Sequence, residues 1–67
     1  MMKVGDELRL RVQPEHVVKT IASLGAGLRV DFTVELEGQR FVTNVTEVDG
    51  DELIGFVVKI EPLERPN

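Results

Sequence analysis

The stretch VDFTVELEGQRFVTNVTEVDGDELIGFVVKI, residues 30–60, decides the fold of this 67-residue chain. It contains three runs rich in β-branched and aromatic residues, the residue types favoured in strands. Two dipeptides separate the runs, Gly38-Gln39 and Asp49-Gly50. Both suit two-residue hairpin loops, since Gly in first position favours a type II′ turn and Asp-Gly favours type I′. The stretch therefore predicts a three-stranded antiparallel meander.

The predicted turns determine which side chains share a face of this meander. The first loop pairs Leu36 with Phe41 and Phe32 with Val45, and the second pairs Val45 with Ile54. Side chains alternate between the faces of a strand, so both hairpins assign the same apolar residues to one face. We expect this core face to contain Val30, Phe32, Val34, Leu36, Phe41, Val45, Ile54, Phe56, Val58 and Ile60.

The same register places an apolar patch on the opposite face, where water is expected. There Val42 lies opposite Val57, and Thr46 lies opposite Leu53. Three interpretations are open: the sheet curls and buries the patch inside a barrel, the patch binds a protein, or it is scattered surface valine without consequence. Val42, Thr46, Leu53 and Val57 are accordingly the candidate interaction residues.

A strand and a helix precede the meander. Residues 2–12 alternate apolar side chains with arginines, which is the period of a half-buried strand. Residues 14–24 predict the only helix, because Pro14 suits its first position and apolar residues form one stripe. Gly25 is expected to end this helix. The predicted strands of the meander are 28–37, 40–48 and 52–60.

These elements predict an α+β fold that is mostly β, in the order strand-helix-strand-strand-strand. Two architectures are compatible with that order. One is a small SH3-like or Sm-like barrel, and the other is an open antiparallel sheet with the helix across one face. The sequence does not determine which edge of the meander the first strand joins.

Length and composition restrict the chain further. We expect one small domain over residues 1–61 and an extended tail over 62–67, because the tail has two prolines. A core below about 70–80 residues rarely supplies more than about 3–5 kcal/mol. The chain has no cysteine and a single histidine, His16, so disulfides, thiolate zinc sites and histidine metal sites are excluded. No cofactor is expected, and self-association, a partner protein or a well-packed core must supply the remaining stability.

The net charge of −4 argues against a protein that holds nucleic acid mainly by neutralising phosphates. A local basic stripe formed by Arg9, Arg11, Arg29 and Arg40 is the exception that the sequence allows. The competing interpretation is that these arginines pair with acidic residues on neighbouring strands. No apolar run is long enough to span a membrane and no secretory signal core is present, so we expect a cytoplasmic protein.

Residues suited to catalysis are few. His16 and Ser23 lie seven residues apart on the predicted helix, about 10 Å by helical rise, which is too far for a hydrogen bond. The acidic residues around the second turn lack the spacing of a calcium-binding loop, so a solvated turn is expected there. We therefore predict a protein that is not an enzyme and holds no metal.

Residues 30–58 loosely resemble the strands of Sm-like small barrels, through Val34-Glu35-Leu36, Gly38 and Asp49. The resemblance implies a small barrel, and Sm-like proteins bind RNA as rings. The chain departs from the Sm pattern because its helix follows a first strand, Thr43 stands where a glycine is expected, and no Met-Asn pair follows Asp49. The RNA-contacting residues of that family are thus missing, and we assign no family.

The sequence as a whole predicts a non-enzymatic, β-rich interaction module that works through protein–protein contacts. Its partner is itself, in a homo-oligomer, or another subunit of an assembly. The alternative is a nucleic-acid-binding small barrel, Sm-like or OB-like, that uses the arginine stripe. The acidic charge disfavours this alternative, and no membrane partner is expected.

Overall fold

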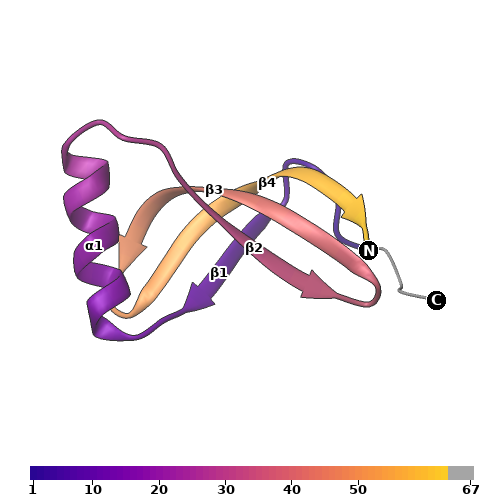
Figure 1. Ribbon diagram of the computed structural model, residues 1–67, viewed down its shortest axis with the longest axis horizontal. Coiled ribbons are helices and arrows are strands. Elements are labelled where there is room, and N and C mark those ends of the chain that lie inside the picture. The colour runs from indigo at the N-terminus through magenta and orange to yellow at the C-terminus, as the bar shows by residue number, and fades with distance from the viewer. Residues whose placement is uncertain (64–67) are drawn as a thin grey trace.

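The computed structural model describes residues 1–63, which form a four-stranded antiparallel sheet and one helix (Figure 1). The elements are β1 (Glu7–Arg11), α1 (Pro14–Gly25), β2 (Val30–Leu36), β3 (Gln39–Asp49) and β4 (Glu52–Pro62). The strand order is β1-β4-β3-β2, so the first strand joins the meander at its β4 edge. The predicted mostly-β class and the element order are confirmed. The sheet is open, with β1 and β2 as its edges.

The helix lies at one end of a long, twisted sheet (Figure 1). β3 and β4 each have 11 residues, whereas β1 has five and β2 has seven. The molecule measures 40 × 23 × 19 Å along its principal axes. A single helix of 12 residues covers only part of such a sheet, and within residues 1–63 most of the sheet therefore has no second layer over it.

Local sequence accounts for both ends of α1. Pro14 occupies the start of the helix, where a missing N–H costs nothing, and Glu15 lies in the first turn. At the other end, the Leu28 N–H donates to the Ser23 carbonyl at 2.9 Å and the Gly27 N–H donates to the Leu24 carbonyl. Gly27 has a positive φ of 77°, so these bonds form a Schellman motif. The helix consequently ends at Gly25, and Gly27 provides the left-handed residue of its C-terminal cap.

The first hairpin turns one residue earlier than the sequence predicts. Its loop is Glu37-Gly38, with Leu36 paired to Gln39. Both loop residues have positive φ, 50° and 76°, as a type I′ turn requires. This register places Arg40 directly opposite Glu35, where the two side chains form an ion pair at 3.1 Å. The shift moves the pairing by two residues, so every side chain of β2 and β3 keeps its predicted face.

The second hairpin differs from the prediction in a way that exchanges faces. Its loop is Gly50-Asp51 instead of Asp49-Gly50, which again moves the pairing by two residues. A β-bulge then leaves Thr46 without a partner in the register, and this moves the pairing back by one. Thr43 is therefore opposite Val57 and not Phe56. Because the net shift is one residue, the β4 side chains opposite this part of β3 lie on the face opposite to the predicted one.

The predicted core face is therefore wrong for the middle of β4. A second register shift leaves Val58 without a partner, and beyond it Ile60 is paired with Phe41 and keeps its predicted face. Ile54 and Phe56 lie on the face opposite to Phe32 and Phe41, because Phe56 is paired with Asn44. Val58 follows the inward-facing Val57 and is 42% exposed. We call the face that carries Phe32 and Phe41 the inner face and the opposite one the outer face. The apolar side chains that are buried in residues 1–63 are Phe41, Val45, Leu53, Ile54 and Val57.

The C-terminal boundary also moves. β4 runs to Pro62, and the Leu63 N–H donates to the Gly38 carbonyl at 2.9 Å. Pro62, the first residue of the predicted tail 62–67, thus belongs to β4, and residues 64–67 of that tail lie outside the described residues.

Candidate interaction surfaces

The four predicted interaction residues do not form one exposed patch. Leu53 and Val57 are buried on the inner face, at 5% and 1% exposure. Val42 is partly exposed on the outer face, and Thr46 is exposed at the bulge. The reason is the net shift of one residue in the second hairpin. It turns Leu53 and Val57 to the inner face and turns their neighbours in β4 to the outer face. An apolar patch on the outer face remains, with different members.

We call that patch the outer strip and define it as Val42, Ile54, Phe56 and Val58. Phe56 and Val58 are 43% and 42% exposed, while Ile54 is 5% exposed. The sequence itself indicates that apolar side chains face outward here, because Phe56-Val57-Val58 is an uninterrupted apolar run. In a strand, such a run places apolar side chains on both faces.

Arg9 lies beside the buried Ile54. The two residues are direct neighbours across β1 and β4. The Arg9 guanidinium lies 3.6 Å from Asp49, 3.5 Å from Glu52 and 3.6 Å from Glu7. Desolvation lowers the pKa of Arg9, but the surrounding carboxylates, Glu7 first, outweigh it and raise the pKa above its ordinary value. Arg9 also offsets the repulsion between Asp49 and Glu52, which are paired at the end of the hairpin.

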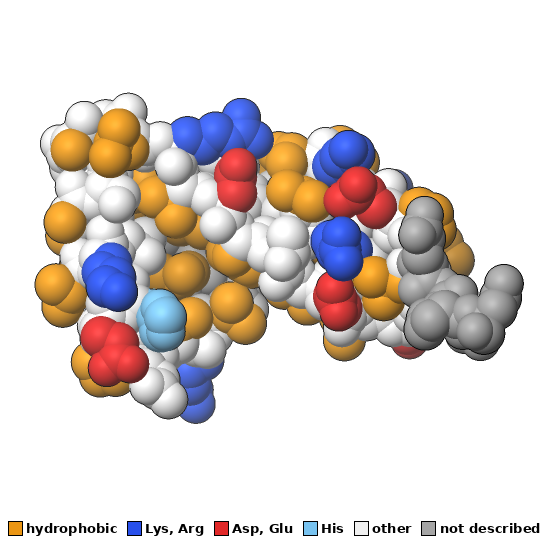
Figure 2. All heavy atoms as spheres, in the orientation of Figure 1, with side chains coloured by type: hydrophobic (Ala, Val, Ile, Leu, Met, Phe, Trp, Pro, Cys, Tyr) orange, Lys and Arg blue, Asp and Glu red, His pale blue; other side chains and the backbone are white. Residues whose placement is uncertain are grey.

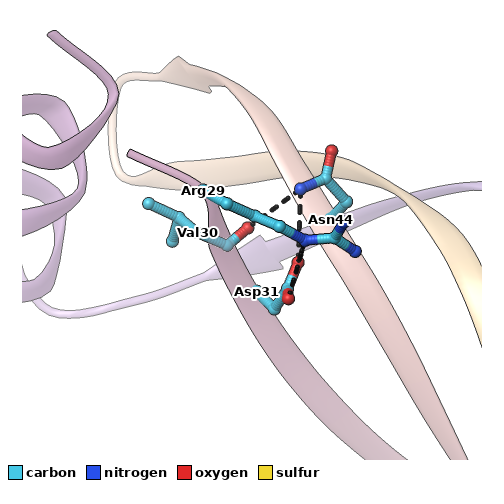
Figure 3. A network of polar contacts seen from close by, with 4 residues as sticks. All are labelled: Arg29, Val30, Asp31 and Asn44. Atoms are coloured by element: carbon cyan, nitrogen blue, oxygen red, sulfur yellow. Dashed lines mark hydrogen bonds and ion pairs between the residues drawn. The ribbon is translucent and has the colours of Figure 1, made fainter. Parts of the chain in front are cut away.

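A second polar cluster holds the edge strand β2 to β3 (Figure 3). The Asn44 side-chain amide donates to the Val30 carbonyl at 3.4 Å and to Asp31 Oδ1 at 3.2 Å. Arg29 Nε donates to both carboxylate oxygens of Asp31 at 3.0 Å. The charge of Asp31 is thus matched by Arg29, and Asn44 fixes the carboxylate in place.

The four candidate nucleic-acid-contacting arginines are not gathered into one stripe. Arg9 and Arg11 belong to β1 at one edge of the sheet, whereas Arg29 precedes β2 at the other edge and Arg40 lies in the interior strand β3. Each of them is ion-paired, including Arg11 with Asp51 at 3.2 Å. Cross-strand and local pairing with acidic residues is therefore the arrangement observed for all four. Nothing in residues 1–63 favours phosphate binding by these side chains.

The inner face holds a hollow of about 340 Å³ beside α1. Hydrophobic side chains are visible in the depression between the helix and the sheet (Figure 2). The apolar residues that line it are Leu10, Val12, Val30, Phe32 and Leu53, and the polar ones are His16, Lys19, Thr20 and Asp31. The hollow lies between the edge strands β1 and β2, which are not paired with each other.

The outward side of α1 is also apolar. Val18 and Ile21 are 66% and 54% exposed, and Leu28 after the helix is 61% exposed. The opposite side of the helix, with the buried Thr20, faces the sheet. Thr20 Oγ1 donates to the His16 carbonyl at 2.8 Å, so its hydroxyl proton is used within the helix.

In residues 1–63, no three His, Cys, Asp or Glu side chains are grouped so that they could hold a metal ion. In that same part of the chain, no helix is both long and apolar enough to cross a membrane.

A scan against protein-family models, a search of curated proteins and a search of solved structures all return no significant match. The function must therefore be inferred from the chemistry of these surfaces.

Proposed function

We propose that this chain is a non-enzymatic interaction module that self-associates through the outer strip. The observation that carries the proposal is the exposure of Phe56 on a sheet face that no described element covers, with the exposed Val58 two residues further along β4. Exposed, contiguous apolar area on a small protein marks an interaction site. The charged pairs around the strip, such as Arg9 with Glu52 and Lys59 with Glu61, would form the polar rim of such an interface.

The size of the exposed surface supports the same proposal. A compact monomer of 7.5 kDa is expected to expose about 4,200 Å². This chain exposes 4996 Å². The excess of roughly 800 Å² matches the ~800 Å² that each partner contributes to an interface of standard size. The radius of gyration of 12.8 Å likewise exceeds the ~11 Å expected of a compact chain of this length.

The closed SH3-like or Sm-like barrel stays a prediction of the sequence. Closure would need β1 and β2 to pair, and these strands are the two edges of the open sheet. The proposed self-association does not depend on closure, because the outer strip lies on β3 and β4 in the middle of the sheet.

Sedimentation equilibrium of the wild type and of Phe56→Lys tests the proposal. A central aromatic contact in an interface contributes at least ~2 kcal/mol, so the substitution should weaken self-association by about 30-fold or more. Phe56 is nearly half exposed in the single chain, and the variant should therefore keep the circular dichroism spectrum of the wild type.

Val18→Lys is the matched control, because Val18 is equally apolar and more exposed but lies on α1. We expect it to leave the association constant unchanged. A wild type that stays monomeric at millimolar concentration would contradict self-association altogether. Dissociation by Val18→Lys in place of Phe56→Lys would show that copies meet through the helix.

A further inference from the structure

We propose that the hollow beside α1 binds a small amphiphilic anion, a medium-chain carboxylate, with its chain in the hollow and its head group at Lys19. This inference is independent of the proposed self-association, because the hollow is on the inner face and the outer strip is on the opposite one.

The walls of the hollow suit an alkyl chain. Leu10, Phe32 and Leu53 approach it from three different strands, with Val12 and Val30 beside them. Of these five residues only Leu53 is buried, so the remaining walls keep apolar surface that a chain could cover. A volume of about 340 Å³ is at the lower end of the ~300–1,000 Å³ typical of small-molecule pockets. A single chain of medium length is therefore the fitting occupant, and a larger ring system is not.

The charge at the rim selects an anionic head group. Lys19 lines the hollow, and its ammonium has no carboxylate within 4 Å among the described residues. The four arginines of residues 1–63 and Lys59 are, in contrast, all ion-paired. His16 lines the hollow on the same helix and offers a ring N–H as a further donor.

The acidic residue at the hollow does not oppose an anion strongly. Asp31 is the only Asp or Glu among the lining residues. Its carboxylate is held by Arg29 and Asn44 (Figure 3). The negative charge of Asp31 is therefore compensated inside the protein, while the positive charge of Lys19 is not.

Titration of the wild type with octanoate, followed by amide chemical shifts, tests the site. We expect the shifts to concentrate on residues of the hollow, such as Lys19, Phe32 and Leu53. Shortening the carboxylate from eight carbons to six and four should weaken binding by up to about fourfold per methylene. Octyltrimethylammonium, with the same chain and the opposite charge, should bind more weakly than octanoate.

Lys19→Glu should weaken octanoate binding by about tenfold and favour the cationic analogue, because an exposed ion pair is removed and a repulsion is added. Lys3→Glu is the matched control: it changes the net charge equally, and Lys3 does not line the hollow. It should leave the affinity unchanged. Equal affinity for the two octyl compounds would overturn the proposal, as would equal effects of the two lysine variants. Binding to anionic vesicles but not to dissolved octanoate would overturn it in favour of a membrane surface.

Discussion

Gly55 is the position where the fold depends most directly on the absence of a side chain. It lies in β4, paired with Val45 on one side and Leu8 on the other. A Cβ at residue 55 would lie 2.3 Å from the Asn44 carbonyl oxygen and 2.9 Å from Thr43 Cγ2. Ordinary contacts of a Cβ are 3.4–4 Å. Gly55→Ala would therefore require the β3 backbone to move by about 1 Å, since the main obstacle is a carbonyl and not a flexible side chain.

The expected cost is large relative to the stability of the domain. Overpacking typically costs about 1–3 kcal/mol even where side chains can yield, and here the backbone has to yield. A gain of about 0.4–1 kcal/mol from the stiffer unfolded chain offsets only part of this. Movement of Asn44 also strains its bonds to Val30 and Asp31. We expect a net loss near 3 kcal/mol, against a total of about 3–5 kcal/mol for a domain of this size.

Urea unfolding followed by far-UV circular dichroism measures the effect, because the chain has no tryptophan or tyrosine to serve as a fluorescent probe. Gly55→Ala should be largely unfolded or should have a much lower midpoint than the wild type. Gly25→Ala is the control, since nothing lies within 4 Å of a Cβ there and the helix should gain about 0.5–1 kcal/mol. If Gly55→Ala unfolds at the wild-type midpoint, the close approach of β3 and β4 beside the bulge is refuted.

Three further substitutions test separate features by the same unfolding measurement. Thr43→Val should stabilise the protein by about 1 kcal/mol, because the buried Thr43 hydroxyl has no hydrogen-bond partner among the described residues; a loss of stability would mean that the hydroxyl is bonded to water. Glu37→Asn should stabilise it by about 0.5–1 kcal/mol, because asparagine tolerates a positive φ better than glutamate; an unchanged midpoint would speak against the type I′ turn. Val57→Lys should unfold the chain, since Val57 is 1% exposed; a folded monomer would place Val57 outside the core.

The hairpins and their order could be predicted from the sequence because glycine-containing loops between β-rich runs restrict the topology strongly. The loop positions could not, because Gly38-Gln39 and Glu37-Gly38 both satisfy a two-residue turn. The choice between them depends on cross-strand contacts, here the ion pair of Glu35 with Arg40. In the first hairpin this error does not change which side chains share a face, because the pairing moves by two residues.

The bulge at Thr46 could not be predicted from the sequence, and it determines which residues form the candidate site. A bulge has no short motif of its own, and its position here depends on contacts between strands distant in sequence. It allows Val48 to pair with Leu53 and Val45 with Gly55 within one hairpin. The unpaired Thr46 therefore transfers Leu53 and Val57 to the core and leaves Phe56 at the surface. The arginines, in contrast, pair with acidic neighbours as the competing interpretation expected.

The sequence of β4 itself supports the view that its outer face is covered in the functional state. A strand with one solvated face alternates apolar and polar residues, whereas a strand covered on both faces is apolar throughout. From Leu53 to Val58, β4 contains no polar side chain at all. Its inner residues are covered by the protein's own core, but on its outer side only Ile54 is buried. Phe56 and Val58 thus follow the pattern of a covered strand without a covering layer in residues 1–63, and a second copy would supply that layer.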